Sequence, residues 1–373
     1  MTKQIIPAAR RYFEPESISW VADRIRKLLA SEEYLSLGRY CEVFEEEVRR
    51  YIGVKYCAVC GSGTDALELI LRAAGTAGGR VIIPVTENPA AALAVIRSGA
   101  FPVFVDSLHD FSPDPGLVER ILSREGDVRA VLGFHGGGFI SESVEELRRL
   151  CNENNVAFLE DAAHAFGSML RGVKAGAIGL AAAFSLYATK VLTAGEGGLV
   201  TTSNQKLEGK VRTLRNYGLE NNELTEIGLS SRMAEAQAII GIAQLRTIEN
   251  NIRRREEIAK LYEERLETIT GVEPIPKPPS LRPNYYKFPV IILKKNTSVE
   301  KIRDYFRKNG INLPGRVFEK PLNRHRVLSR FSEGVYSVAE HLSRTHITLP
   351  IYPQLSYGDV ELVVKTLKDA LSD

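Results

Sequence analysis

Cysteine is scarce in this sequence, with four residues among 373, and this argues against a fold held together by disulfides. Cys57 and Cys60 form a C-x-x-C pair, which by itself is half of a zinc site or a redox pair. No second C-x-x-C and no paired histidines follow in the sequence to complete a metal site. Because residues 56–60 are typical of a buried strand, we interpret both cysteines as core residues and predict no metal site.

Long apolar runs are also missing. No run reaches the ~18 residues that a membrane-spanning helix needs, and residues 1–11 lack the apolar core of a signal peptide. The sequence therefore predicts a protein with no membrane partner, located in the cytoplasm.

Neither sign of charge dominates. The 49 basic and 46 acidic residues leave a net charge of +3, so no large basic surface is available for a nucleic-acid backbone. Arg253, Arg254 and Arg255 form a basic run, but two glutamates follow at once. We interpret this run as a solvated helix face and predict no nucleic-acid partner.

Short apolar runs alternate with amphipathic stretches through the first two thirds of the chain. The expected strands are 56–60, 81–83, 102–106, 130–134 and 156–161, and the clearest helices between them are 64–74 and 143–152. Alternation of this kind predicts an α/β fold with a mostly parallel central sheet covered by helices.

The last third of the chain has a different pattern. Residues 234–268 predict one long helix or two joined helices, and the five prolines within 271–283 predict a connecting segment. Further apolar and amphipathic stretches at 286–293, 298–309 and 357–371 indicate a smaller α/β domain. We predict a large domain over 14–250 and a small C-terminal domain over 251–373, with residues 1–13 packing nearby.

Three polar segments follow predicted strands, which is where α/β sheets gather their binding residues. The first contains Gly63 and Thr64 at the start of a helix. Unpaired backbone N–H groups at a helix N-terminus bind phosphate. An ordinary strand-to-helix turn with a threonine cap is the alternative.

The second segment places Asp161 at the end of a strand, with His164 three residues later. A helix cap or salt bridge is the structural alternative for Asp161, and a core position is the alternative for His164. The third segment carries Lys190 in a small and apolar stretch that begins at Phe184 and Ser185. Desolvation would lower the pKa of this lysine towards the range useful in catalysis, whereas a solvated surface lysine would keep its ordinary value.

Together the three segments match the needs of pyridoxal 5'-phosphate (PLP). The cofactor has a phosphate, which the first segment and Ser185 could hold, and an aldehyde that forms an imine with a lysine such as Lys190. Its ring nitrogen must stay protonated, and a buried carboxylate such as Asp161 achieves this.

The sequence resembles the DegT/StrS family of PLP-dependent nucleotide-sugar aminotransferases over nearly its whole length. The motifs that carry the resemblance are Gly-Thr-Asp-Ala-Leu at 63–67, Asp-Ala-Ala-His at 161–164, the lysine segment 184–198, Arg-Asn-Tyr-Gly at 215–218 and Ser-Arg-Met-Ala-Glu at 231–235. The resemblance implies a fold-type-I PLP-dependent transferase that works as a homodimer with shared active sites. It also implies that Gly63, Thr64 and Ser185 bind the phosphate, that Asp161 pairs with the ring nitrogen, and that His164 lies close to the ring.

Two positions depart from the family pattern. Asn88 stands where many members have an aromatic residue that stacks on the cofactor ring. Ser230 stands where many members have an asparagine that reaches the phosphate from the partner subunit. We predict that both residues contact the cofactor and that cofactor binding differs from that of other family members.

The resemblance implies transfer of an amino group from an amino acid, L-glutamate by analogy, to a keto group of a nucleotide-linked sugar. Such enzymes serve polysaccharide or deoxyamino sugar biosynthesis. A cyclitol aminotransferase and a non-catalytic regulatory or binding protein of the same fold are the alternatives. Lys320, Arg324 and Arg326 are candidates to meet a substrate diphosphate, with a solvated basic loop as the other interpretation.

Overall fold

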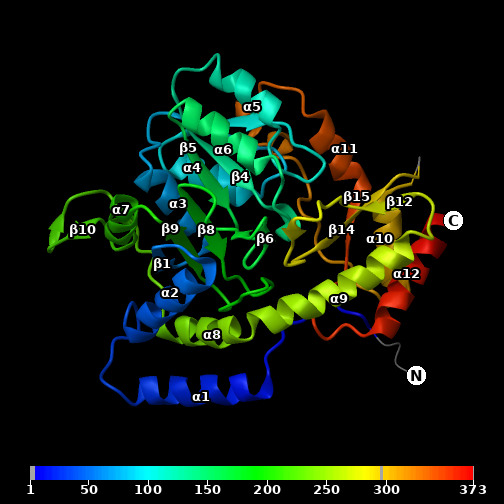
Figure 1. Ribbon diagram of the computed structural model, residues 1–373, viewed down its shortest axis with the longest axis horizontal. Coiled ribbons are helices and arrows are strands. Elements are labelled where there is room, and N and C mark those ends of the chain that lie inside the picture. The colour runs from blue at the N-terminus through cyan, green and yellow to red at the C-terminus, as the bar shows by residue number, and fades with distance from the viewer. Residues whose placement is uncertain (1–4, 295–296, 373) are drawn as a thin grey trace.

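A mixed sheet forms the centre of the computed structural model, which describes residues 5–294 and 297–372 (Figure 1). Within these residues its strand order is β1-β9-β8-β5-β4-β2-β3. The strands are β1 (Tyr56–Cys60), β2 (Arg80–Pro84), β3 (Phe101–Val105), β4 (Val128–Phe134), β5 (Ala157–Asp161), β8 (Ala181–Ser185) and β9 (Gly198–Thr202). Neighbours pair in parallel except β9, which is antiparallel to both β1 and β8. The mostly parallel sheet predicted from the sequence is confirmed.

Helices connect these strands and cover the sheet. They are α2 (Arg39–Ile52), α3 (Gly63–Ala73), α4 (Pro89–Arg97), α5 (Pro115–Leu122), α6 (Val144–Glu153), α7 (Gln205–Arg215) and α8 (Glu235–Arg246). The helix α1 (Pro15–Leu29) lies outside α8 (Figure 1). Because both faces are covered, the inner strands are apolar along their whole length rather than alternating, as β2 illustrates with four buried residues in succession.

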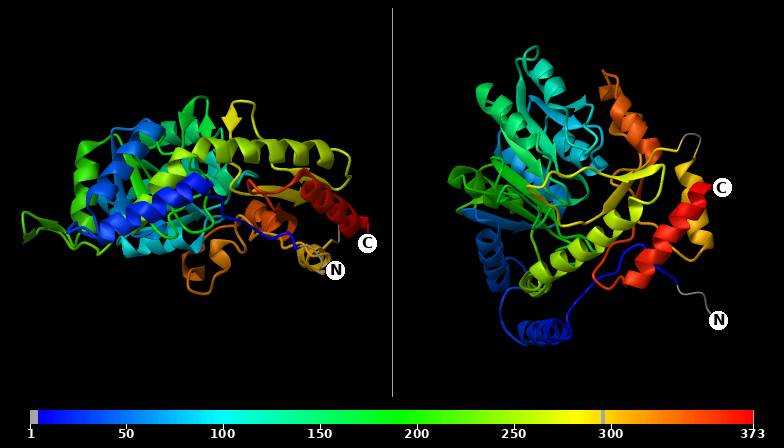
Figure 2. Two further views of the ribbon diagram at one scale, coloured as in Figure 1. Left: turned by 90° about the horizontal axis from the view of Figure 1, so that it is seen from below. Right: turned by 45° about the vertical axis from the view of Figure 1, so that its right-hand side comes forward.

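The C-terminal part is built around a smaller antiparallel sheet of order β12-β14-β15. Its strands are β12 (Val272–Pro274), β14 (Phe288–Ile292) and β15 (His346–Leu349), and its helices are α10 (Val299–Lys308), α11 (Ser337–Thr345) and α12 (Tyr357–Ser372). Helix α9 (Ile248–Leu266) follows α8 directly and runs along this part (Figure 2). The sequence pattern at 234–268 therefore corresponds to two joined helices. The exact division of the chain at residue 250 stays a prediction.

Short elements connect the two parts. The strands β6 (Met169–Leu170) and β7 (Val173–Lys174) form a small sheet with β13 (Leu281–Arg282). Apart from this sheet, β10 (Leu219–Glu220) and β11 (Glu223–Leu224) form a hairpin that projects from the body (Figure 1). Turns of 3-10 helix occur at Gly136–Gly138, Leu322–Arg324 and Ser329–Phe331. The proline-rich stretch 271–283 is thus more than a connector, because β12 and β13 lie within it and pair with other strands.

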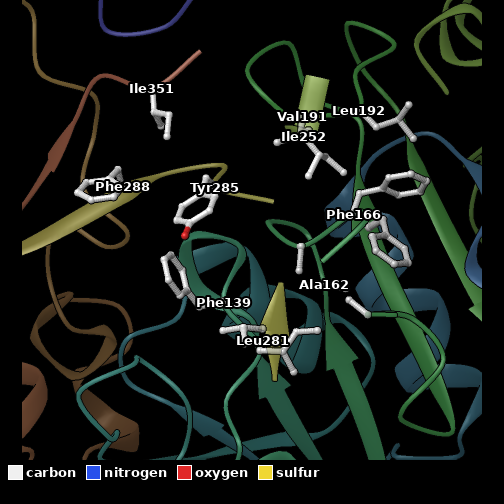
Figure 3. Close-up of a cluster of buried hydrophobic side chains, with 14 of the residues drawn as sticks. Phe139, Ala162, Phe166, Val191, Leu192, Ile252, Leu281, Tyr285, Phe288 and Ile351 are labelled. Carbon is white, nitrogen blue, oxygen red and sulfur yellow. The ribbon is translucent and has the colours of Figure 1, made fainter. Parts of the chain in front are cut away.

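Aromatic and aliphatic side chains fill the space between the large sheet and the C-terminal part (Figure 3). Phe139 and Tyr285 meet edge to face with their ring centroids 5.8 Å apart, and Tyr285 also stacks on Phe288. This core fixes the start of β14 against the loops at the carboxyl ends of the parallel strands, so residues from both parts can line one site.

The predicted core role of the cysteines is confirmed. Cys57 and Cys60 lie in β1 and are 3% and 0% exposed, and all four cysteines are buried and free. Burial raises the pKa of the Cys60 thiol to about 12, which is the behaviour of an inert core thiol. Within residues 5–294 and 297–372, His, Cys, Asp and Glu side chains form no group of three that could hold a metal ion.

The interpretation of the basic run at 253–255 as a solvated face is wrong for Arg255. Its guanidinium is buried in α9 and donates hydrogen bonds to Asn251 Oδ1 and to the carbonyls of Tyr285 and Ile351. Arg254 also donates to backbone carbonyls, those of Pro353 and Leu355. These arginines hold α9 against the C-terminal sheet and the loop after it.

The N-terminal segment runs beside the C-terminal part. Ile6 pairs with Ile311 in a parallel bridge, and its N–H donates to the Gly310 carbonyl at 2.9 Å. Residues 1–4 lie outside the described residues. Among the described helices, none combines the length and apolar character that a bilayer crossing requires.

Candidate active site

Lys190 lies in the loop between β8 and β9, close to the start of β14. Its Nζ sits 4.6 Å from the centroid of the Tyr286 ring. Burial lowers the pKa of Lys190 to about 7, the charge of Asp161 acts in the opposite direction, and the charge of Lys287 lowers it further. Near neutral pH a substantial fraction of this amine is therefore unprotonated.

Asp161 ends β5, the neighbour of β8, and is 3% exposed. Its Oδ1 accepts the Ala163 N–H at 2.9 Å. Burial raises the pKa of this carboxyl, while the Ala163 N–H and the positive charge of Lys190 oppose that rise. The charges of Asp161 and Lys190 therefore act on each other, as is expected of two residues in one site.

The start of α3 packs against Ser185, the last residue of β8. Ser62 caps the helix by accepting the Asp65 N–H at 3.1 Å, so the cap is two residues earlier than the threonine cap considered from the sequence. A Cβ on Gly63 would stand 2.7 Å from the Ser185 Cβ, which makes glycine a requirement of this close approach. Gly63, Thr64 and Ser185 therefore come together beside unpaired helix N–H groups.

His164 follows β5 and is 9% exposed. Its Nδ1 accepts the Gly137 N–H at 3.2 Å, and its ring lies 4.7 Å from the Tyr286 ring. Burial lowers the pKa of His164 well below its ordinary value, and the charges of Lys190 and Lys287 add to this. The imidazole is neutral, and its other nitrogen is the one that can donate a hydrogen bond.

Asn88 and Ser230 lie in different parts of the structure, Asn88 at the start of α4 and Ser230 between β11 and α8. Asn88 caps α4 by accepting the Ala90 N–H with its side-chain oxygen at 3.0 Å. Ser230 is exposed and lies next to Tyr217, on the segment that carries the β10–β11 hairpin. Within one chain Ser231, rather than Ser230, reaches the start of α3, where its Oγ accepts the Gly61 N–H at 3.0 Å.

Three residues that the sequence analysis did not single out lie at this site. Glu87, directly before Asn88, is fully buried and near Asp161 and Lys190. Tyr286 and Lys287 come from the start of β14, about a hundred residues beyond Lys190. An acidic residue next to a family cofactor position was a usable signal for Glu87. Tyr286 and Lys287 offered no signal, because they begin the stretch 286–293, which the sequence analysis assigns to the smaller α/β domain.

A cavity of about 650 Å³ opens beside Lys190. It is lined by α8 and α9, the start of β14, the residues after β15 and the N-terminal segment 8–12. Its basic lining residues are Arg10, Arg11, Lys190, Arg255 and Lys287, and no acidic residue stands among the described residues that line it. The cavity is therefore electropositive, which favours an anionic ligand.

The expectation that Lys320, Arg324 and Arg326 lie at the mouth of this site is not met within the chain. None of the three lines the cavity. Lys320 and Arg324 border a separate surface depression, where Arg324 pairs with Glu340. The cations beside Lys190 come instead from the N-terminal segment, α9 and β14, which no local sequence pattern connects.

Comparison with known proteins agrees with this geometry. GDP-perosamine synthase of Caulobacter vibrioides is 29% identical, covering 90% of this chain and 91% of that protein. The dTDP-3-amino-3,4,6-trideoxy-alpha-D-glucose transaminase of Micromonospora megalomicea is 30% identical, covering 94% and 95%. The solved structure of DesV from S. venezuelae superposes with a TM-score of 0.89 at 30% identity, covering 96% of each chain. The profile of one family matches residues 18–368, and the chain belongs to the DegT/DnrJ/EryC1/StrS aminotransferase family.

Proposed function

We propose that this protein is a PLP-dependent aminotransferase that moves an amino group from an amino acid, L-glutamate, to a keto group of a nucleotide-linked sugar. The observation that carries the proposal is a buried lysine of lowered pKa that interacts electrostatically with a buried carboxyl, at the edge of an electropositive cavity. Membership of an aminotransferase family supports the reaction type.

The residues at the site fit PLP. The close approach of Gly63 to Ser185 leaves the N-terminus of α3 open to a phosphate, Asp161 supplies a carboxylate for a ring nitrogen, and Lys190 supplies an amine. When bound, PLP provides an aldehyde for an amine and a protonated ring that withdraws electrons from the substrate carbon. We assign the holding of the cofactor to Gly63, Thr64, Ser185, Asp161 and Lys190.

Lys190 is the residue that moves a proton. Its pKa of about 7 lets the Nζ both accept and return a proton near neutral pH. His164 is neutral, is fixed by the Gly137 N–H and lies beside Tyr286. It can pack against the cofactor ring without adding charge. We also assign a cofactor contact to Asn88, which would use its amide nitrogen because its oxygen accepts the Ala90 N–H in capping α4.

The cavity supports a substrate with a diphosphate. A nucleotide-linked sugar adds two or more negative charges to those of the cofactor, and Lys287 lies within the cavity next to Lys190. Its Nζ donates to the Gly315 carbonyl and keeps two further protons for a ligand. A free cyclitol has no anion for these cations to meet, so the charge of the cavity favours the nucleotide-linked sugar over a cyclitol. The names of the two curated relatives, which refer to GDP- and dTDP-linked sugars, agree with this.

A homodimer with shared sites also belongs to the proposal. Leu224 and Ile227, on the segment between α7 and α8, are 65% and 84% exposed, and exposed apolar side chains of this kind favour a subunit contact. Ser230 and Arg232 lie on the same segment and would reach the partner's site. We place the enzyme in the cytoplasm, where nucleotide-linked sugars would be its small-molecule substrates.

Absorption spectra test the reaction type. The purified protein with PLP should show a visible band that L-glutamate bleaches and that a keto sugar restores. A chain that stays colourless with added PLP would contradict the proposal and favour a non-catalytic role.

Nucleotide competition tests the substrate class. Free UDP, GDP or dTDP should inhibit the second half-reaction, and Lys287→Met should weaken the inhibition. If none of the three inhibits at millimolar concentration while a free cyclitol ketone is aminated, the cyclitol alternative replaces the nucleotide-linked sugar.

A further inference from the structure

Glu87 is a buried carboxyl that forms no ion pair with any residue that the structure describes. It follows β2 and precedes α4, and its exposure is 0%. Its Oε2 accepts the Asn88 N–H at 3.2 Å, while its buried Oε1 receives no hydrogen bond from the described part of the chain. Glu68 offers a contrast, because it is equally buried but pairs with Arg72 and Arg97. An ionised carboxylate in the position of Glu87 would carry the full cost of desolvation.

Glu87 also interacts with another carboxyl, that of Asp161. The two side chains lie within hydrogen-bonding reach of each other. Two carboxylates cannot hydrogen bond unless one of them is protonated, and like charges so close oppose ionisation of both. Burial raises the pKa of Glu87 well above its ordinary value, and the charge of Asp161 raises it further.

Asp161 is the better site for the negative charge of the pair. The Ala163 N–H, the positive charge of Lys190 and a hydrogen bond from Glu87 all lower its pKa against the effect of burial. The pKa of Glu87 is lowered only by the Asn88 N–H and, more weakly, by the charge of Lys190. The proton therefore resides on Glu87 and the charge on Asp161.

We propose that Glu87 is a positioning residue, whose protonated carboxyl donates a hydrogen bond to Asp161 and orients the Asp161 carboxylate for the ring nitrogen of the cofactor. The Ala163 N–H fixes one oxygen of Asp161 at 2.9 Å, and Glu87 supplies a second anchor from the turn between β2 and α4. The positioning role rests on the proposed function, whereas the hydrogen bond from protonated Glu87 to Asp161 (the shared proton) does not.

Two substitutions distinguish a role of Glu87 as a hydrogen-bond donor from a role in filling space. Glu87→Gln has nearly the same shape, keeps a donor for Asp161 through its amide NH₂, and keeps an oxygen for the Asn88 N–H. Glu87→Met fills a similar volume but cannot donate. Neither places a charge at position 87, and Asp161 keeps the Ala163 N–H and the positive charge of Lys190 as partners, so both variants should fold. Thermal unfolding of the apoprotein checks this.

Infrared difference spectra of the apoprotein test the shared proton. Wild type at neutral pH should show the carbonyl stretch of a protonated carboxyl, and Glu87→Gln should remove it. Glu235→Gln is the matched control, because Glu235 is equally buried but accepts N–H bonds from Gly38, Tyr40 and Cys41 and should contribute no such band. A wild-type spectrum without the band, or a band unchanged in Glu87→Gln, would overturn the proposal.

Binding of pyridoxamine phosphate to the apoprotein tests the positioning role. Loss of a hydrogen bond to a charged group should weaken binding roughly ten- to a hundredfold in Glu87→Met, and Glu87→Gln should restore affinity to within about threefold of wild type. Equal losses in both variants would show that an ionised Glu87 is required, and no loss in either would reduce Glu87 to a space-filling residue. Either result overturns the positioning role. A wild-type chain that binds no cofactor would instead overturn the proposed function and the positioning role with it, leaving the infrared result to stand on its own.

Discussion

Replacement of Lys287 by methionine should raise the pKa of Lys190. Both ammonium groups lie over the Tyr286 ring, with Nζ at 4.6 Å from its centroid for Lys190 and 5.1 Å for Lys287. The two nitrogens are therefore no more than about 10 Å apart, and at an effective dielectric constant of about 20 their repulsion is at least about 1.7 kcal/mol. Removal of the Lys287 charge favours protonated Lys190, so its pKa should rise by about one, from about 7 towards 8.

The rate at which the apoprotein takes up PLP reports this pKa, because only the unprotonated amine reacts. The pH of half-maximal uptake should move upward by about one in Lys287→Met. Lys174→Met is the matched control, since Lys174 also lies over a tyrosine ring, that of Tyr51 at 4.5 Å, but does not act on Lys190. An unchanged midpoint in Lys287→Met, or an equal shift in the control, would refute the electrostatic coupling between the two lysines.

Three further outcomes are expected from the proposed site. Lys190→Arg should abolish the visible absorption of the bound cofactor and amino transfer, because a guanidinium does not deprotonate usefully; a fully active variant would disprove the role of Lys190. Asp161→Ala should still bind some PLP but transfer amino groups roughly a hundredfold more slowly or worse, and near-normal turnover would make Asp161 a structural residue. Mixing inactive Lys190→Ala chains with inactive chains altered at Ser230 and Arg232 should restore part of the activity measured in verified heterodimers, and no recovery would indicate sites built within single chains.

Local patterns determined much of the fold. The predicted strands at 56–60 and 102–106 correspond closely to β1 and β3, and the helix at 64–74 corresponds to α3 (Gly63–Ala73). Such elements are predictable because fully buried strands are continuously apolar and amphipathic helices repeat every 3.6 residues. The antiparallel β9 between β1 and β8 was not predictable in this way, since its apolar pattern is the same in either direction.

The central part of the site was predictable for a related reason. Asp161 ends β5 and Ser185 ends β8, and the carboxyl ends of parallel neighbours meet at one edge of the sheet. Lys190 stands in the loop that follows. Their proximity follows from the parallel pairing of β5 with β8, although 181–185 was not among the strands expected from the sequence.

The rest of the site depends on contacts between distant segments. Tyr286 and Lys287 reach Lys190 only because Tyr285 and Phe288 anchor the start of β14 in the core shared by both parts. Arg255 belongs to a run of charges that the sequence presents as solvated, and only the carbonyls of Tyr285 and Ile351 make its burial possible. The sequence by itself determined which elements form and where Lys190 and Asp161 stand on them. The tertiary structure alone decided which charges surround these two residues, because desolvation and electrostatic coupling depend on distance in space and not on separation along the chain.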